Sequence, residues 1–284
     1  MHRKLFTTQQ FLATGRTEME LRWGEKKGWW TRLIRSVYGE GAQPPTPFEL
    51  ALAHGLASER PVGGLVAAKM HGLDGIAIPE SGIPRRRTAP VSPEPVLIDG
   101  IWCTNGLQTM IDLAALVDPL VWEQANESAL HKGLFKIDEE LSLLPVLSAS
   151  RTAGAPLMRK MLSLRPPNAP PTESLLETLT VQLARRTPGV PEPTRQHVIR
   201  NEHDQFVARV DLTWPDEGAF TELDGEHHKD QPVYDANRQT EVAIVTGWLC
   251  GRFSWTEVRW NPASTGRRLV RLLATARRQP RRQD

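Results

Sequence analysis

The chain has 284 residues with a formal net charge of +2, and 39% of its residues are hydrophobic. This length suits two or three small domains with apolar cores. Because no window approaches the roughly 18 apolar residues of a membrane span and the amino terminus lacks a signal-peptide core, we expect a cytoplasmic protein without membrane segments. The two cysteines, Cys103 and Cys250, stand far apart, so the sequence indicates neither a disulfide framework nor a cysteine-based zinc site.

The charge is distributed unevenly along the chain. Residues 1–42 hold eight Lys or Arg against four acids, and residues 263–284 hold seven Arg against one Asp. Basic ends on an acidic body suggest contact with a polyanion, because clustered Lys and Arg supply most non-specific affinity for nucleic acid. A solvated charge run explains the tail as well. We expect residues 263–284 to form a basic helix or tail.

The first elements predict a winged helix-turn-helix over residues 1–42. Residues 7–14 and 17–27 each begin with a Thr able to cap a short helix. Residues 29–38 alternate and are rich in aromatic and β-branched side chains, which favours a strand. In a winged helix the second helix enters a DNA groove. The candidate DNA-binding residues are the basic side chains of this region: Arg16, Arg22, Lys26, Lys27, Arg32 and Arg35.

Residues 43–164 predict a mixed α/β middle domain. Helical patterns at 47–57 and across 107–162 flank a Pro-rich stretch, 76–105, that carries short apolar segments typical of strands. The run RPPNAPPTES at 165–174 then marks the clearest boundary, since consecutive prolines cannot continue a helix.

A pair of carboxylates marks the region after this boundary. An amphipathic helix at 172–186 and a strand at 195–200 precede two strands, FVARVDLTW and AFTELDG, that are joined by the turn PDEG. In a symmetric hairpin Asp211 faces Glu222, and like charges in that position are destabilising. A shared Mg²⁺ or Mn²⁺ would turn the repulsion into coordination, with Asp224 on the same face. A solvated hairpin is the alternative.

Three further side chains could serve phosphate chemistry at this hairpin. His228 and Lys229 lie in the segment GEHHK, and Arg238 lies on a helix formed by VYDANRQTEVAIVTGW, before a final strand near 248–255. Such groups can orient water, donate a proton or stabilise developing charge. The alternative is that these side chains lie on the surface and have no role in catalysis.

The segments SLLET, RVDLTWPDEGAFTELDGEHH and YDANRQTEVAIVTGW, with Arg252 and Trp255 beyond, resemble uncharacterised domains related to very-short-patch-repair endonucleases of the PD-(D/E)XK superfamily. The resemblance implies a restriction-endonuclease-like α/β core over 170–262, with Asp224 in place of the usual lysine of the E-X-K motif. A basic group would then have to come from 228, 229 or 238. The residues that match the family's pattern are Glu177, Asp211 and Glu222 as ligands of Mg²⁺ or Mn²⁺, and Asp224, His228 and Arg238.

The amino-terminal part, through GLVAAKMHGLDG, CTNGLQTMIDLA and HKGLF, is similar to the AbiEi family of winged-helix antitoxin and repressor proteins. This resemblance covers about 1–160 and implies operator binding by residues 1–42. A toxin, another protein or a second copy of the chain would be the protein partner.

We therefore expect an α+β multidomain protein and carry two hypotheses for its function. The first is a DNA-binding, Mg²⁺-dependent endonuclease, acting on duplex or single-stranded DNA, in which metal-bound water attacks phosphorus. The second is an antitoxin-like transcriptional repressor with an inactive nuclease-like domain. The missing lysine favours the repressor, whereas the retention of Glu177, Asp211 and Glu222 together favours the enzyme, which is our leading expectation.

Overall fold

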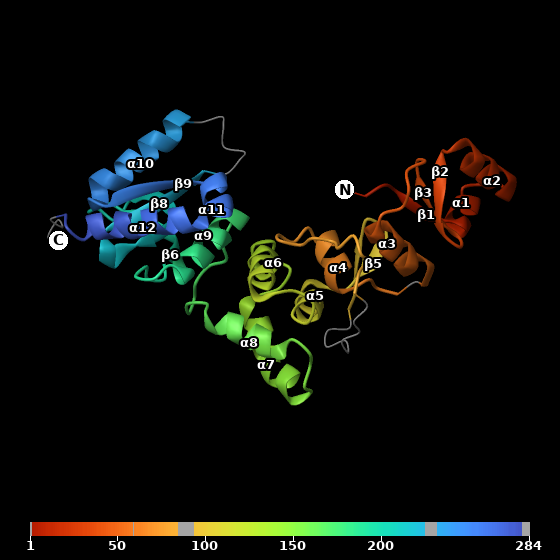
Figure 1. The fold of residues 1–284 in the computed structure, drawn as a ribbon, viewed down its shortest axis with the longest axis horizontal. Helices are drawn as coiled ribbons and strands as arrows, with labels where there is room; N and C mark the ends of the chain where they lie inside the picture. The colour runs from red at the N-terminus through yellow and green to blue at the C-terminus, as the bar shows by residue number, and fades with distance from the viewer. Residues whose placement is uncertain (1, 59, 85–93, 225–231, 280–284) are drawn as a thin grey trace. The chain divides into compact units, whose positions relative to one another are not determined.

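The computed structural model describes residues 2–58, 60–84, 94–224 and 232–279, with the backbone alone for 232–238. The chain is α+β, as expected, and forms two compact units, Met1–Leu164 and Arg165–Asp284 (Figure 1). None of the described helices has the length and apolar character needed to cross a membrane. The finer division into 1–42, 43–164, 170–262 and 263–284 stays a prediction.

The first unit opens with a small antiparallel sheet in the strand order β1-β3-β2. Both predicted helices are present, but residues 29–38 do not form a single strand. The chain turns back at Ser36, whose φ of 68° ends one strand and starts the next. A short first strand was also not predicted. The elements are β1 (Leu5–Thr7), α1 (Thr8–Ala13), α2 (Glu18–Lys27), β2 (Trp30–Ile34) and β3 (Val37–Glu40).

This sheet is covered on both faces. An aromatic cluster that includes Phe11, Trp30 and Tyr38 packs α1 and α2 against one face. On the other face, α3 (Pro47–Ser58) packs Ala53 against Leu33 and Val37. Burial of these side chains is the main source of stability for so small a sheet. The fold therefore leaves the outer side of α2 in solvent.

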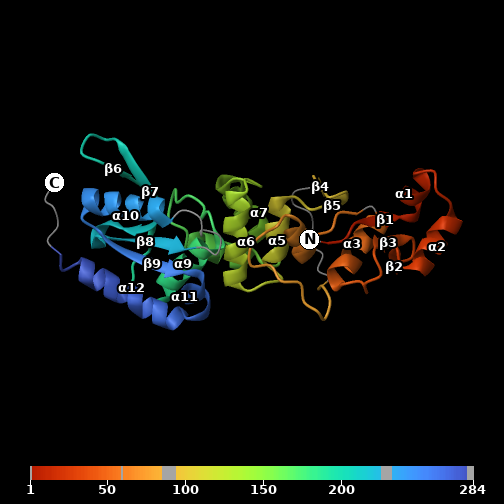
Figure 2. The same cartoon turned by 90° about the horizontal axis from the view of Figure 1, so that it is seen from above.

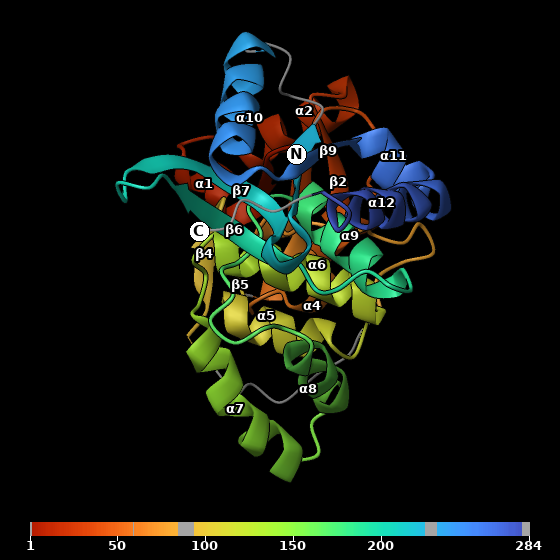
Figure 3. The same ribbon diagram turned by 90° about the vertical axis from the view of Figure 1, so that its left-hand side faces the viewer.

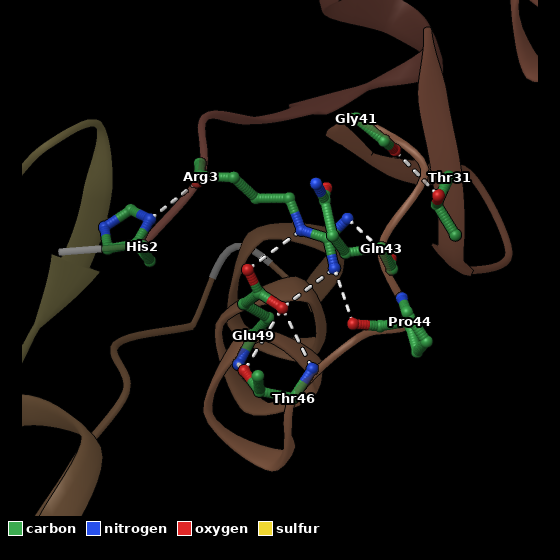
Figure 4. Close-up of polar contacts among 8 residues, drawn as sticks. All are labelled: His2, Arg3, Thr31, Gly41, Gln43, Pro44, Thr46 and Glu49. Atoms are coloured by element: carbon green, nitrogen blue, oxygen red, sulfur yellow. Dashed lines mark hydrogen bonds and ion pairs between the residues drawn. The ribbon is translucent and has the colours of Figure 1, made fainter. Parts of the chain in front are cut away.

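An ion pair joins the chain before β1 to the start of α3 (Figure 4). Arg3 donates from Nε and Nη2 to the two carboxylate oxygens of Glu49, at 2.8 and 2.9 Å, and also to the carbonyls of Gln43 and Pro44. Thr46 caps α3 and donates its backbone N–H to the same carboxylate at 2.9 Å. Glu49 is only 7% exposed, so a charge-assisted network takes the place of water around it.

The rest of the first unit is mainly helical, as predicted for 107–162. Its core gathers Met110, Trp122, Leu147 and Met158, and a two-stranded hairpin precedes α5. The elements are α4 (Gly64–Met70), β4 (Val96–Ile98), β5 (Ile101–Cys103), α5 (Gly106–Leu113), α6 (Pro119–His131), α7 (Ile137–Ala149) and α8 (Ala155–Ser163).

The second unit is built on a four-stranded sheet in the order β6-β7-β8-β9. The first three strands are antiparallel, and β9 runs parallel to β8 because α10 carries the chain back. Gly218, with φ of 69°, closes the turn between β7 and β8. The elements are α9 (Leu175–Arg186), β6 (Thr194–Arg200), β7 (Phe206–Trp214), β8 (Ala219–Asp224), α10 (Pro232–Thr246), β9 (Leu249–Ser254), α11 (Trp255–Trp260) and α12 (Pro262–Ala276).

Helices cover both faces of this sheet. In Figures 1 and 3, α10 lies on one face, while α9 and α12 lie on the other. Leu179 and Leu269 pack with Trp214 on the α9 side, and Val242 packs with Phe220 on the α10 side. Figure 2 shows the β6–β7 hairpin reaching beyond the rest of the unit. The core on the α9 side fixes this helix against the strands that carry Asp211 and Glu222.

We predict that Glu49→Gln lowers the free energy of unfolding by about 3 kcal/mol, because it leaves the mostly buried Arg3 without its counter-charge. Burial alone would raise the pKa of Glu49, but hydrogen bonds from Arg3 and Thr46 outweigh it and lower the pKa from 4.5 to about 2. In the wild type, the contribution of Glu49 to the free energy of unfolding should therefore be complete above pH about 4.5 and disappear as the pH falls through 2.

Urea unfolding followed by tryptophan fluorescence measures this effect. Glu40→Gln removes the same charge from an exposed position of the same sheet and should cost less than about 0.5 kcal/mol. Equal losses for the two variants would show that the network does not stabilise the unit.

Candidate functional site

The helix α2 is held in one position on the amino-terminal sheet. Thr17 accepts a hydrogen bond from the N–H of Glu20, whose carboxylate accepts one from the N–H of Thr17 at 2.7 Å, so a capping box starts the helix. At its middle, Trp30 donates from the indole Nε1 to the carbonyl of Leu21 at 2.8 Å. A Cβ atom at Gly24 would lie 2.1 Å from the Trp30 ring, so only glycine fits at this position. The rotation of α2 is therefore fixed.

This rotation exposes a mixed basic and apolar face of α2. Arg22 and Lys26 are exposed, one helical turn apart. Met19 and Trp23 are 79% and 49% exposed on the same side of the helix. Arg22 pairs with Glu18 at 3.4 Å, and this ion pair is exposed to solvent and weak enough to exchange for another anion. Large apolar side chains in solvent beside cations mark α2 as a contact surface.

The other predicted DNA-binding residues surround this helix. Arg16 precedes α2 with its guanidinium 5.2 Å from the centre of the Phe11 ring, and Lys27 lies over Trp23. Arg35 is exposed at the turn between β2 and β3. Arg32 differs from the rest, since it binds Glu25 at 2.9 Å and lies over Tyr38. Sequence reasoning did not single out Met19 or Trp23, although an apolar residue on a polar helix face is a signal for contact.

In the second unit, Glu177 is a buried carboxylate on α9. It is 4% exposed and accepts hydrogen bonds from the N–H of Glu173, at 3.0 Å, and from Nε2 of Gln196, at 2.7 Å. Burial raises the pKa of Glu177 to about 7 against these hydrogen bonds, and the nearby charge of Asp211 adds to the rise. Glu177 and Asp211 therefore interact, although they come from a helix and a strand far apart in sequence.

The predicted register of the hairpin is confirmed at its closed end. Leu212 pairs with Thr221, Thr213 with Phe220, and Trp214 with Ala219. The paired positions of β7 and β8 end at Leu212 and Thr221, one position before Asp211 and Glu222. Next to this position β6 is irregular, because Gln196 has a φ of 48°. No sequence signal predicts Gln196 as a partner of Glu177, because the two residues lie on different elements that only tertiary packing brings together.

Glu222 and Asp224 face the parallel strand β9. Glu222 is 6% exposed and lies opposite Arg252 in the register. Arg252 donates to both carboxylate oxygens of Asp224, at 3.2 and 2.5 Å. Burial, and then the charge of Glu222, raise the pKa of the Cys250 thiol to about 12. Among the described residues, Arg252 supplies a positive charge next to these carboxylates and binds Asp224.

Two of the remaining predicted residues, His228 and Lys229, lie outside the described residues, and Arg238 lies on α10 where only the backbone is described. Within the described part of the chain, no group of three or more His, Cys, Asp or Glu side chains is arranged to hold a metal ion. Convergence of Glu177, Asp211 and Glu222 on one ion stays a prediction, as do the roles of 228, 229 and 238.

Comparison with known proteins gives one family. Residues 1–40 match the family described as transcriptional regulator, AbiEi antitoxin. No curated protein matches the chain, and no solved structure does. The match supports the resemblance seen in the amino-terminal part and covers β1 to β3. The wider resemblance over 1–160, and that of 172–262 to nuclease-like domains, stay predictions.

We predict that Glu177→Gln makes the protein more stable than the wild type at pH 8, measured with EDTA present. Folding raises the pKa of this carboxyl, so its full contribution to the free energy of unfolding is present below pH about 4.5, where it is protonated. This contribution is lost as the pH rises through about 7 and the buried group ionises. The variant should gain about 2 to 3 kcal/mol at pH 8 and nothing at pH 4.5. Glu202→Gln, on an exposed turn, is the control and should show no such pH dependence. A variant that is no more stable than the wild type at pH 8 would contradict the prediction.

Proposed function

We propose that the amino-terminal region is a winged-helix domain and that the protein is a transcriptional regulator that binds duplex DNA through α2. The observation that carries this proposal is the match of residues 1–40 to the transcriptional regulator family. The order of elements supports it, since two short helices are followed by the β2–β3 hairpin. In this proposal α2 is the recognition helix and the hairpin is the wing.

The exposed face of α2 has the chemistry that reading DNA requires. Arg22 and Lys26 are placed to contact guanine edges or phosphates, since both types of group accept hydrogen bonds from cations. The exposed Met19 and Trp23 supply apolar contacts of the kind that thymine methyl groups accept. The basic groups around the helix, Arg16, Lys27 and Arg35, would fix its position by contacting phosphates. Arg32 would help to orient the wing through Glu25.

The test is a gel shift with duplex DNA taken from upstream of the protein's own gene. Arg22→Gln with Lys26→Gln should weaken binding at least tenfold and reduce the slope of log affinity against log salt by about two at most. Lys132→Gln with Lys160→Gln removes the same charge from exposed positions of the same unit and should leave affinity within about twofold. Equal weakening by both pairs, or tight binding by the α2 variant, would contradict the proposal.

A second candidate function is phosphodiester hydrolysis by the carboxylates of the second unit. The specific observation that favours it is the burial of Glu177 next to the charge of Asp211, which costs free energy unless a cation relieves it. Mg²⁺ and Mn²⁺ prefer such oxygen ligands. Glu222, on the strand next to that of Asp211, would be the third ligand after Glu177 and Asp211. Arg252 offers a cation where the resemblance lacks its lysine. A metal held there would supply an activated water and neutralise charge on the phosphate.

Cleavage of duplex and single-stranded DNA with Mg²⁺ or Mn²⁺ tests this candidate. Wild type should nick DNA and stop with EDTA, and Asp211→Asn should reduce cleavage at least a hundredfold while duplex binding by the first unit is kept. Asp216→Asn, on the turn between β7 and β8, is the control with the same chemical change. Wild-type protein that binds DNA and never cleaves it would leave the regulator as the function and remove this candidate. The protein partner, a toxin or a second copy, stays a prediction.

A further inference from the structure

A groove in the second unit lies between α9 and α12. It has a volume of about 840 Å³, and its lining is mainly apolar and includes Leu183 and Val270. The helices approach closely here because Gly266 has no side chain, and a Cβ at this position would lie 2.7 Å from the Thr187 hydroxyl. The inner face of α12 is anchored in the core by Leu269 and Leu273. The walls of the groove are therefore rigid parts of the fold.

The rim of this groove is basic. Arg267 and Arg271 stand one helical turn apart on the exposed side of α12, and Arg186 stands opposite them at the end of α9. Arg186 donates from Nε to the carbonyl of Gln182 within its own helix. Neither Arg267 nor Arg271 has an acidic partner among the described residues, and none of the described residues that line the groove is acidic.

Two neighbouring arginines differ in this respect. Arg268 of α12 pairs with Glu257, and Arg277, the residue that follows the helix, pairs with Glu217. Among the described residues these two cations are thus neutralised, whereas the two at the groove have no acidic partner. Like charges one turn apart repel each other, so folding alone gives no reason for the pair at 267 and 271. A bound anion would relieve this repulsion.

We propose that this groove binds the phosphate backbone of duplex DNA and is a second nucleic-acid contact, separate from α2. Guanidinium groups suit phosphate because their planar donors can pair with two oxygens at once. The apolar part of the lining accommodates the arginine stems and the sugar edge of a strand. The choice of DNA rather than an acidic protein rests on the proposed function of the first unit. Contacts of this kind add affinity without reading sequence.

The full-length chain tests this with two matched variants. The groove variant carries Arg267→Gln and Arg271→Gln, and the control carries Arg268→Gln and Arg277→Gln, so that each loses two charges from α12 and the residue that follows it. Binding is measured across a salt series from about 50 to 200 mM, with a duplex from upstream of the gene and with a scrambled duplex. The groove variant should bind both duplexes at least fivefold more weakly, with the salt slope reduced by about two. The control should lose less than about twofold, and the preference between the duplexes should not change in either variant.

The results that would overturn the groove proposal differ from those that would overturn the proposed function. If both variants lose the same affinity, the effect is one of net charge and the groove has no role. If the groove variant binds as the wild type does while Arg22→Gln with Lys26→Gln abolishes binding, the regulator stands and the groove proposal falls. If the groove variant keeps DNA binding but loses binding to poly-glutamate, the groove takes an acidic protein, which also overturns the proposal. Unfolding midpoints of all variants show whether each is folded.

Discussion

The placement of α3 on the amino-terminal sheet depends on the ion pair between Arg3 and Glu49. This pair joins the chain before the first strand to the first turn of α3, and its charges lie largely out of solvent. Because Glu49 also completes the cap of α3, one carboxylate fixes both the start of the sheet and the start of the helix that covers it. The opposite face of the sheet is then left to α1 and α2. The exposure of Arg22 and Lys26 follows from this arrangement rather than from the composition of α2 alone.

Charge is used differently in the two units. In the first, the cations of α2 lie in solvent, where an ion pair is worth little and can be exchanged for phosphate. In the second, Glu177 and Glu222 are buried carboxylates, and the fold bears the cost of their desolvation. Exposed cations suit reversible association with a polyanion, whereas buried carboxylates suit a bound cation. The two proposed functions therefore draw on separate physical properties and can be tested separately.

Much of the fold could be predicted because its signals are local. The ends of β7 and β8 follow from a two-residue period and the turn PDEG, and the register of Leu212 with Thr221 follows from the length of that turn. The strand β1 could not be predicted, since three residues show no period. The reversal at Ser36 depends on a positive φ in a residue that rarely adopts one.

The sites were predictable to a smaller extent. Asp211 and Glu222 stand out as the opposed carboxylates of the predicted hairpin, and Glu177 follows from the family resemblance. The contact of Gln196 with Glu177 joins a strand to a helix, and no sequence pattern indicates it. The groove of Arg186 with Arg267 and Arg271 joins helices from the two ends of the second unit, so only tertiary packing brings it together. In the sequence these arginines are indistinguishable from Arg268 and Arg277, which are paired.

The central claim is that α2 is the helix that meets DNA. Amide hydrogen exchange on the full chain, with and without a duplex from upstream of its gene, measures this most directly because it locates the contact without altering any residue. The account predicts slower exchange on binding over residues 17–27 and around the turn at 35 and 36. Protection confined to the second unit, with α2 exchanging as in the free protein, would contradict it.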